Sequence, residues 1–326
     1  MSARFDAPWW LRDPHAQTLW GKFLRGGAAP TTQRERWELP DGDFLDIHRL
    51  AGAAGRPRLV LLHGLEGSVD SHYVRGFLAA ALHHGLPADL VIFRSCGGEP
   101  NRLLRSYHSG ETGDIGYVIS RLIAEDPDRE IVLAGVSLGG NVVLKYLGER
   151  STVLAPQVKA AAAISTPFDL AEGCRHLERG FSRVYQWHFL RTLRRKAREK
   201  ASRFPGRIDG AAVDAARTLW EFDDAVTAPI HGFASAANYY ARSSSIGFLA
   251  RIARPTLLLS AADDPFLPAS VLDQVRTIAA DNPQLVLEFS PHGGHVGFVG
   301  GRSPWAADYH AERRAVDFLL DRKSVV

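Results

Sequence analysis

Residues 130–141 read EIVLAGVSLGGN and join a strand pattern to a candidate nucleophile. The first part, Glu130–Val136, is a continuous apolar run, as expected of a strand buried on both faces of a parallel sheet. The second part, Gly135 to Gly139, has the form G-x-S-x-G around Ser137, and a helical pattern begins at Asn141. A strand, a sharp glycine-flanked turn and a helix lift a serine hydroxyl above the edge of a sheet. This stretch therefore predicts an α/β fold with Ser137 as nucleophile.

Apolar runs of the same kind recur on both sides of this stretch and alternate with segments of helical spacing. This rhythm is typical of βαβ units, and a period-two hairpin precedes them. The sequence therefore predicts a mostly parallel, eight-stranded sheet with helices on both faces. The expected strands are Arg34–Leu39, Phe44–Leu50, Arg58–Leu62, Asp89–Arg94, Glu130–Val136, Lys159–Ser165, Pro255–Ala261 and Gln284–Ser290, and the expected helices are Val74–His84, Asp114–Ala124, Asn141–Glu149, Ser270–Ala280 and Ala307–Leu320.

Residues 167–253 interrupt this alternation, because they contain helical patterns but no clear buried strand. Helices are expected over Leu177–Arg203 and Ala211–Glu221. An insertion between the fourth and fifth parallel strands emerges at one end of the sheet. We therefore expect an α/β core of residues 1–166 and 254–326 with a helical cap of residues 167–253; the alternative is a surface elaboration without a catalytic part.

A serine nucleophile needs a histidine base and an acid that orients the base, and in such folds both follow the serine in chain order. The loop after the sixth parallel strand contains His292 and His295, and the flanking glycines favour His295. The loop after the fifth contains Asp263 and Asp264. Asp264 is preferred because it precedes a proline, whose rigid turn would fix the carboxylate, and Asp263 is expected to cap the next segment.

Two backbone N–H groups are expected to form an oxyanion hole. The first belongs to Leu138, directly after the nucleophile, and the second to Leu65 in the sequence HGLEG at 63–67. This second sequence follows the apolar run Arg58–Leu62, which is where the second donor is expected. His63 is interpreted as ordering this loop.

Composition sets further bounds. The 326 residues include 39 Lys or Arg and 36 Asp or Glu, and a net charge of +3 does not imply a nucleic acid partner. Two cysteines, Cys96 and Cys174, are expected to be free thiols.

No phosphate-binding glycine motif and no metal-ligand spacing is present, so no cofactor and no metal are expected. The chain lacks a signal-peptide pattern and a membrane-length apolar run, which favours a cytoplasmic protein.

The charge is unevenly placed, however. Between Arg175 and Arg207 there are 11 Lys or Arg and 2 Glu, a local net charge of +9. Such a segment is either a solvated helix face or a surface for anionic lipid or an acidic substrate.

Large, mostly aromatic residues of the cap are expected to form an apolar acyl pocket or to pack on the sheet; they are Trp187, Phe189, Leu190, Trp220, Phe222, Tyr239 and Tyr240. Two polar, glycine-containing stretches, Arg94–Asn101 and Tyr107–Thr112, are expected to brace the site or to line it.

Taken with these motifs, the chain resembles the YheT-like branch of the α/β-hydrolases, also called the AB-hydrolase type 4 family. The resemblance rests on the segments 15–18, 63–67, 94–101, 107–112, 135–141, 263–266 and 293–298. It implies a Ser-Asp-His serine hydrolase acting on carboxylic esters, with Ser137, Asp264 and His295 at the corresponding positions.

The predicted function is hydrolysis of carboxylic esters, lipophilic ones in particular, through an acyl-enzyme on Ser137. A thioesterase, amidase or acyltransferase would use the same triad. A catalytically inactive hydrolase fold that binds a partner is the alternative from another class. Oligomeric state and acyl length are not predicted.

Overall fold

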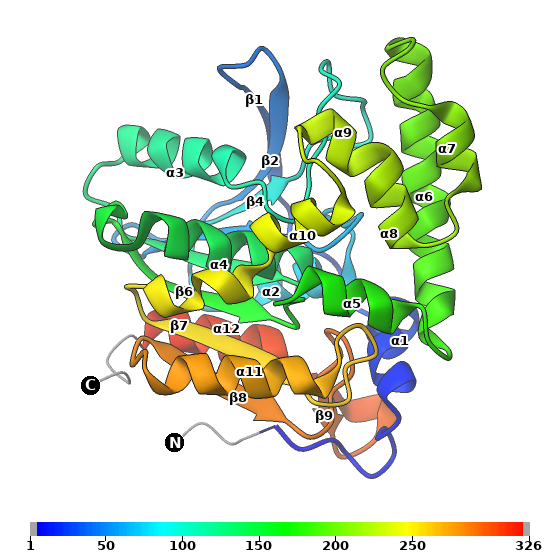
Figure 1. Cartoon of the computed structure of the whole chain (residues 1–326). Coiled ribbons are helices and arrows are strands. Elements are labelled where there is room, and N and C mark those ends of the chain that lie inside the picture. The colour runs from blue at the N-terminus through cyan, green and yellow to red at the C-terminus, as the bar shows by residue number, and fades with distance from the viewer. Residues whose placement is uncertain (1–4, 322–326) are drawn as a thin grey trace.

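Eight strands form one sheet in the computed structural model, which describes residues 5–321 (Figure 1). Their order is β1-β2-β4-β3-β5-β6-β7-β8. β3 to β8 are parallel, while β1 and β2 form an antiparallel hairpin that joins the sheet at β4. The prediction of eight mostly parallel strands is confirmed. The strands are β1 (Gln33–Glu38), β2 (Phe44–Leu50), β3 (Arg58–Leu62), β4 (Ala88–Ile92), β5 (Ile131–Val136), β6 (Val158–Ile164), β7 (Thr256–Ala261) and β8 (Leu285–Ser290), with a separate hairpin of β9 (Val299–Gly301) and β10 (Ala307–Tyr309).

Helices cover both faces of the sheet and also form a group beside it (Figure 1). Among the described residues, no helix combines the length and the apolar character needed to cross a membrane. The helices are α1 (Pro14–Leu24), α2 (His72–His83), α3 (Gly113–Glu125), α4 (Leu138–Arg150), α5 (Leu170–Leu177), α6 (Ser182–Arg203), α7 (Gly210–Ala215), α8 (Leu219–Phe222), α9 (Ala228–His231), α10 (Ala236–Ser243), α11 (Ala269–Ala280) and α12 (His310–Leu320), and the shorter turns are η1 (Ser151–Val153), the π-helical η2 (Asp223–Thr227), η3 (Ser245–Arg251) and η4 (Pro304–Ala306).

The core lies on both faces of the parallel strands, which explains why these strands read as unbroken apolar runs. In β3, Leu59 and Leu61 pack with α2 and α12 on one face. Val60 and Leu62 pack with α3, α4 and α11 on the other. Both faces of the same strand are therefore removed from water, and only its ends can carry chemistry.

The position of β3 between β4 and β5 determines where a site can form. After β3 the chain continues to β4 on one side of it, and it later crosses to β5 on the other side. The loops that follow β3 and β5 therefore run in opposite directions across the edge of the sheet. In open parallel sheets, a crevice for ligands forms at such a point, beyond the carboxyl ends of the strands. The HGLEG loop follows β3, and Ser137 follows β5.

The segment between β6 and β7 is helical, as expected, and has its own apolar cluster. Helices α5 to α10 share buried residues such as Leu190, Val213 and Tyr239. One expected helix is wrong in its continuity. Leu177–Arg203 is divided at residues 178–181, where Gly180 has a left-handed backbone (φ +49°), and α6 begins only at Ser182.

Two other expected helices also differ from the structure, one by a break and one by a later start. The expected helix Ala211–Glu221 is two short helices, because Thr218 forms a capping box with Glu221 and starts α8 anew. The expected helix Ala307–Leu320 begins three residues late, because residues 307–309 pair with β9 as β10. A local helical pattern does not reveal such a pairing.

Candidate active site

Ser137 lies in a strained turn between β5 and α4. Its φ of +54° is in the left-handed region, which a non-glycine residue rarely adopts. A Cβ on Gly135 would lie 2.3 Å from the carbonyl oxygen of Gly139, and one on Gly139 would lie 2.4 Å from that of Leu62. Both flanking positions therefore require glycine, since a side chain at position 135 would meet the start of α4 and one at position 139 would meet the end of β3.

Three side chains from three loops meet beyond the ends of the strands. The Oγ of Ser137 lies 3.0 Å from Nε2 of His295, and Nδ1 of His295 lies 2.9 and 3.1 Å from the carboxylate oxygens of Asp264. Asp264 and His295 are both buried. A carboxylate at Nδ1 requires a proton on that nitrogen, so Nε2 is free to accept the hydroxyl proton of Ser137. The structure brings together the three residues that the sequence proposed.

Aromatic stacking and the first helix hold His295 in place. The imidazole stacks on Phe266, with ring centroids 3.9 Å apart and an interplanar angle of 9°. The backbone N–H of His295 donates to Oγ1 of Thr18. Gln17 holds the end of the same loop: its side-chain N–H₂ donates to the carbonyl of Val299, and its side-chain oxygen accepts the N–H of Val299. These three supports were not expected from the sequence, where segment 15–18 stood out only through the family resemblance.

The two rejected candidates, Asp263 and His292, contact each other instead of the serine. Their carboxylate and imidazole lie 3.2 Å apart. Asp263 also accepts the backbone N–H of Gly294 at 2.9 Å. The expectation that Asp263 caps the next segment is wrong, since it braces the loop that carries His295. The N–H of Phe266 is bonded by Asp264 itself.

Leu65 and Leu138 lie beside Ser137 along one cavity. A Cβ on Gly64 would lie 3.3 Å from the Cβ of Ser137, so the HGLEG loop runs directly past the serine. Leu138 is the first residue of α4, and its N–H therefore has no carbonyl partner within the helix. The two backbone positions that the sequence singled out thus flank the serine.

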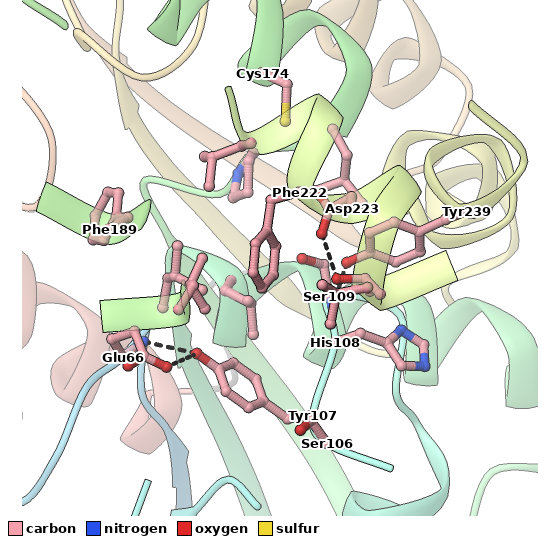
Figure 2. A pocket seen from close by; sticks show the side chains of 18 of the residues that line it. Glu66, Ser106, Tyr107, His108, Ser109, Cys174, Phe189, Phe222, Asp223 and Tyr239 are labelled. Atoms are coloured by element: carbon pink, nitrogen blue, oxygen red, sulfur yellow. Dashed lines mark hydrogen bonds between the residues drawn. The ribbon is translucent and has the colours of Figure 1, made fainter. Parts of the chain in front are cut away.

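A polar network holds the residue after Leu65. Glu66 has a left-handed backbone (φ +56°), and its N–H donates to the hydroxyl of Tyr107, which in turn donates to the Glu66 carboxylate at 2.8 Å. The ammonium of Lys196, on α6, lies 2.8 Å from each oxygen of that carboxylate. A cap helix is thereby joined to the loop that runs past Ser137. Figure 2 shows the bonds between Glu66 and Tyr107. Sequence reasoning missed this ion pair, whose members are 130 residues apart.

The two polar stretches, Arg94–Asn101 and Tyr107–Thr112, differ in their roles. Arg94 is a buried brace, with two bonds of 2.7 Å to Asp114 and a 2.8 Å ion pair with Asp41. In the other stretch, Tyr107, His108 and Ser109 both line the cavity and take part in bracing contacts. Burial raises the pKa of the Cys96 thiol to about 12, so this cysteine is not a thiolate at neutral pH.

His63 orders its loop, as expected, and does so as a neutral imidazole. Its Nδ1 donates to the carbonyl of Gly64 at 2.7 Å, and its Nε2 accepts the N–H of Phe93 at 3.1 Å. Burial, and to a lesser extent the charge of Lys196, lowers its pKa from 6.5 to about 4. Protonation would remove the acceptor that Phe93 uses.

We expect this histidine to make the fold sensitive to acid. The unfolded chain takes up a proton near pH 6.5 and the folded chain only near pH 4, so stability present above pH 6.5 is lost as the pH falls between these values. From pH 7.5 to pH 5 the loss from His63 is about 2 kcal/mol of unfolding free energy. Urea unfolding at both pH values should show that His63→Gln has a smaller pH dependence than the wild type by this amount.

The difference between the two proteins isolates His63 from the other histidines whose pKa is lowered by burial, which are His48, His72, His108, His176, His188, His231 and His310. His83→Gln, at an exposed position of α2, is the matched control and should retain the full pH dependence. An unchanged pH dependence in His63→Gln would contradict the assignment.

An apolar cavity of about 160 Å³ extends from Ser137 into the cap (Figure 2). A single water needs only about 10–15 Å³ by the same measure, so the cavity has room for a chain of carbon atoms. Of the seven expected wall residues, four line it: Phe189, Phe222, Tyr239 and Tyr240. Leu190 is buried elsewhere in the cap and Trp220 packs against Tyr240, whereas Trp187 is 59% exposed on the outside of α6.

Asp223 is one of the polar groups that interrupt the apolar lining, and it lies on the cap side. Asp223 accepts hydroxyl groups from Thr227 and, at 2.6 Å, from Tyr240. Burial raises the pKa of Asp223 to about 6. Cys174, a free thiol like Cys96, donates to the same Tyr240 hydroxyl. Asp223, Thr227, Tyr240 and Cys174 therefore form a polar cluster on the cap side of the cavity.

Comparisons with known proteins identify the family of this chain. The family described as the alpha/beta hydrolase fold matches residues 57–301. The chain is 41% identical to the Escherichia coli (strain K12) protein named "Putative esterase YheT", over 88% of this chain and 84% of that one. It is 28% identical to mouse phospholipase ABHD3, over 92% of this chain and 74% of that one. The solved structure of the Pyrococcus furiosus esterase Pf2001 matches 84% of this chain and 89% of that one with a TM-score of 0.55, at 16% identity, which supports the fold alone. The chain therefore belongs to the alpha/beta hydrolase family, within its YheT-like branch.

Proposed function

We propose that this protein is a serine hydrolase that cleaves carboxylic esters, with Ser137 as nucleophile, His295 as base and Asp264 as the acid that orients it. The observation that carries the proposal is the unbroken hydrogen-bonded chain from Asp264 through His295 to the hydroxyl of Ser137. The names of the relatives, an esterase and a phospholipase, support the same reaction class.

In this mechanism Oγ of Ser137 attacks the ester carbonyl carbon while its proton moves to Nε2 of His295. Asp264 stabilises the imidazolium that forms. The N–H groups of Leu65 and Leu138 donate to the oxygen that becomes negative, and the N-terminus of α4 adds a favourable field there. His295 then protonates the leaving alcohol, and a water that it activates releases the acid from Ser137. No cofactor is required.

The substrate class follows from the cavity. The surface of its walls is mostly apolar and includes leucine and aromatic side chains such as Leu193, Phe189 and Phe222. Apolar surface favours an acyl or alcohol chain without charge, at about 25 cal/mol per Å² of buried apolar area. We therefore propose lipophilic esters, with residues 167–253 acting as a cap that supplies the chain-binding wall over a core of residues 1–166 and 254–326.

Hydrolysis of p-nitrophenyl butyrate and labelling by a fluorophosphonate probe test the proposal together. We expect turnover and one labelled serine in each chain, because the probe reacts only with an activated hydroxyl. Matched thioester and amide analogues in the same assay should give lower kcat/KM values. A protein that is neither labelled nor active would be an inactive hydrolase fold, and a higher kcat/KM for the thioester would replace the esterase with a thioesterase.

The network around Glu66 predicts a separate effect on the oxyanion hole. Glu66→Gln removes the charge that attracts Lys196 and loosens the strained turn next to Leu65. Losing one oxyanion donor costs about 10²–10³ in kcat, so a partial displacement should lower kcat about tenfold. KM for p-nitrophenyl butyrate should change much less, since glutamine has nearly the same size as Glu66 and the leucine and aromatic side chains of the cavity are unchanged.

Glu99→Gln is the matched control for this variant. It makes the same change in an ion pair with Arg36 on the protein surface, where Glu99 is largely exposed. Its steady-state kinetics should equal those of the wild type. If Glu66→Gln also retains the wild-type kcat, the link from Lys196 to the oxyanion hole does not exist.

A further inference from the structure

Large apolar side chains are exposed on the outer side of α6 and at the end of α1. The exposed fractions are 50% for Phe181, 50% for Val184 and 59% for Trp187, and 69% for Phe23 and 62% for Leu24. Positions 181, 184 and 187 recur every three residues, which places them along one side of the chain entering and forming α6. We call these five residues the exposed apolar surface.

The two parts of this surface adjoin each other in space. Lys22 of α1 contacts His188 of α6 at 3.4 Å. His15, at the start of α1, lies against Phe181 with ring centroids 4.6 Å apart. Figure 1 shows α1 beside the lower part of α6. The two segments that carry the five side chains therefore lie side by side, and large apolar side chains exposed on neighbouring segments mark interaction sites.

Cations surround the exposed apolar surface. Arg183, Arg191 and Arg195 are exposed on α6, and none of them has an acidic partner in the part of the chain that the structure describes. The guanidinium of Arg191 lies 5.6 Å above the ring of Trp187. Lys22 adds a fourth positive charge, and the 2 acidic residues between 175 and 207 are Glu178 and Glu199. An aromatic cluster with flanking arginines complements a partner that is apolar inside and negatively charged at its surface.

The opposite side of α6 lines the cavity. Phe189, Leu193 and Ala197 face the space that extends from Ser137, while Val184 and Trp187 face outward. One helix therefore separates the exposed apolar surface from the candidate active site. A partner bound there would lie within one helix diameter, about 10–12 Å, of the cavity.

We propose that the exposed apolar surface binds the headgroup region of an anionic lipid bilayer, and that this places the cavity where lipophilic esters are concentrated. The second part rests on the proposed esterase function. Tryptophan and phenylalanine insert at the boundary between headgroups and acyl chains, and arginine and lysine extend their charges to the phosphates above. Attraction to anionic lipid adds to the apolar contribution and is weakened by salt. A bilayer fits both the aromatic cluster and the unpaired cations.

Vesicle flotation with the full chain tests the proposal. Vesicles of phosphatidylcholine with 30% phosphatidylglycerol should bind the protein at 50 mM NaCl, and affinity should fall at least tenfold on phosphatidylcholine alone or at 500 mM NaCl. Trp187→Glu should also lose at least tenfold in affinity, because it places a negative charge at the centre of the exposed apolar surface.

Two valine positions give a matched pair. Val184→Glu lies in the exposed apolar surface, and Val153→Glu lies in η1, at the end of α4 remote from Ser137, where Val153 is 79% exposed. Only Val184→Glu should weaken binding, while both variants should keep the wild-type melting temperature. Equal binding of the two, or binding that is independent of anionic lipid, would overturn the proposal.

Separate readouts distinguish this inference from the proposed function. Hydrolysis of soluble p-nitrophenyl butyrate by the same wild-type preparation reports on the esterase alone. If the ester is hydrolysed and vesicles are not bound, the bilayer proposal is wrong and the esterase stands. If instead the wild type is a dimer that Trp187→Glu dissociates, the surface serves a second copy of the chain and the bilayer proposal is again wrong.

Discussion

Ser137→Ala will lower kcat for p-nitrophenyl butyrate by at least about 10⁴-fold and will abolish fluorophosphonate labelling. The variant lacks the only atom that can form the acyl-enzyme in the proposed mechanism. Loss of a serine nucleophile from a triad typically removes about 10⁶ in kcat, and the activity that is left comes from the oxyanion hole and substrate binding. KM should change little, because the cavity walls and the backbone donors at Leu65 and Leu138 are retained.

The fold should tolerate this change. Ser137 already occupies a left-handed conformation, and alanine at the same φ of +54° meets the same backbone strain. The hydroxyl contributes one hydrogen bond, to His295, whose loss is worth about 1 kcal/mol. Melting temperature therefore separates loss of chemistry from loss of structure.

Ser260→Ala is the matched control for the nucleophile. Ser260 is buried in β7, and its hydroxyl has no hydrogen-bond partner among residues 5–321. The variant should keep full activity and labelling. Activity above one tenth of wild type in Ser137→Ala, or labelling that persists in it, would show that another residue is the nucleophile and would refute the proposed triad.

The sequence predicted the strands of this protein well because each is a short apolar run between polar turns. It allowed Ser137, Asp264 and His295 to be proposed as one site because each follows a parallel strand, and the loops after parallel strands meet at one edge of the sheet. Helix ends were harder. The breaks at Gly180 and Thr218 depend on single residues within otherwise helical stretches, and the pairing of residues 307–309 with β9 depends on a partner strand.

Contacts that support the site were largely unpredictable, because they join residues far apart in sequence. Thr18 meets His295 across 277 residues and Lys196 meets Glu66 across 130, and no local spacing marks either pair. The sequence contains only a weak indication that the Trp187 side chain faces away from the cavity. Phe189, Leu193 and Ala197 recur every four residues and mark the side of α6 that lines the cavity, and position 187 does not belong to this series. Arginines occur on several sides of the helix, so the sequence does not show clearly which side is apolar.

The choice between the two adjacent aspartates yields the second large effect. Asp264→Asn should lower kcat by about 10⁴-fold while Asp263→Asn lowers it less than about tenfold. An amide at position 264 can donate its N–H₂ to Nδ1 of His295, which then keeps its proton on Nε2. A protonated Nε2 cannot accept the proton of Ser137, so the base is lost although its geometry survives.

Asp263→Asn removes a charge of the same sign one residue away, yet it leaves the bond between Asp264 and His295 intact. Its expected cost is structural: the N–H of Gly294 keeps an acceptor in the amide oxygen, while the contact with His292 weakens. Stability should fall by about 1 kcal/mol or less. Steady-state kinetics with p-nitrophenyl butyrate, and the rate of fluorophosphonate labelling, measure the contrast on two independent scales. If Asp263→Asn proved the more damaging variant on both, Asp263 would be the acid, and the His295 loop would have to rearrange during catalysis to reach it.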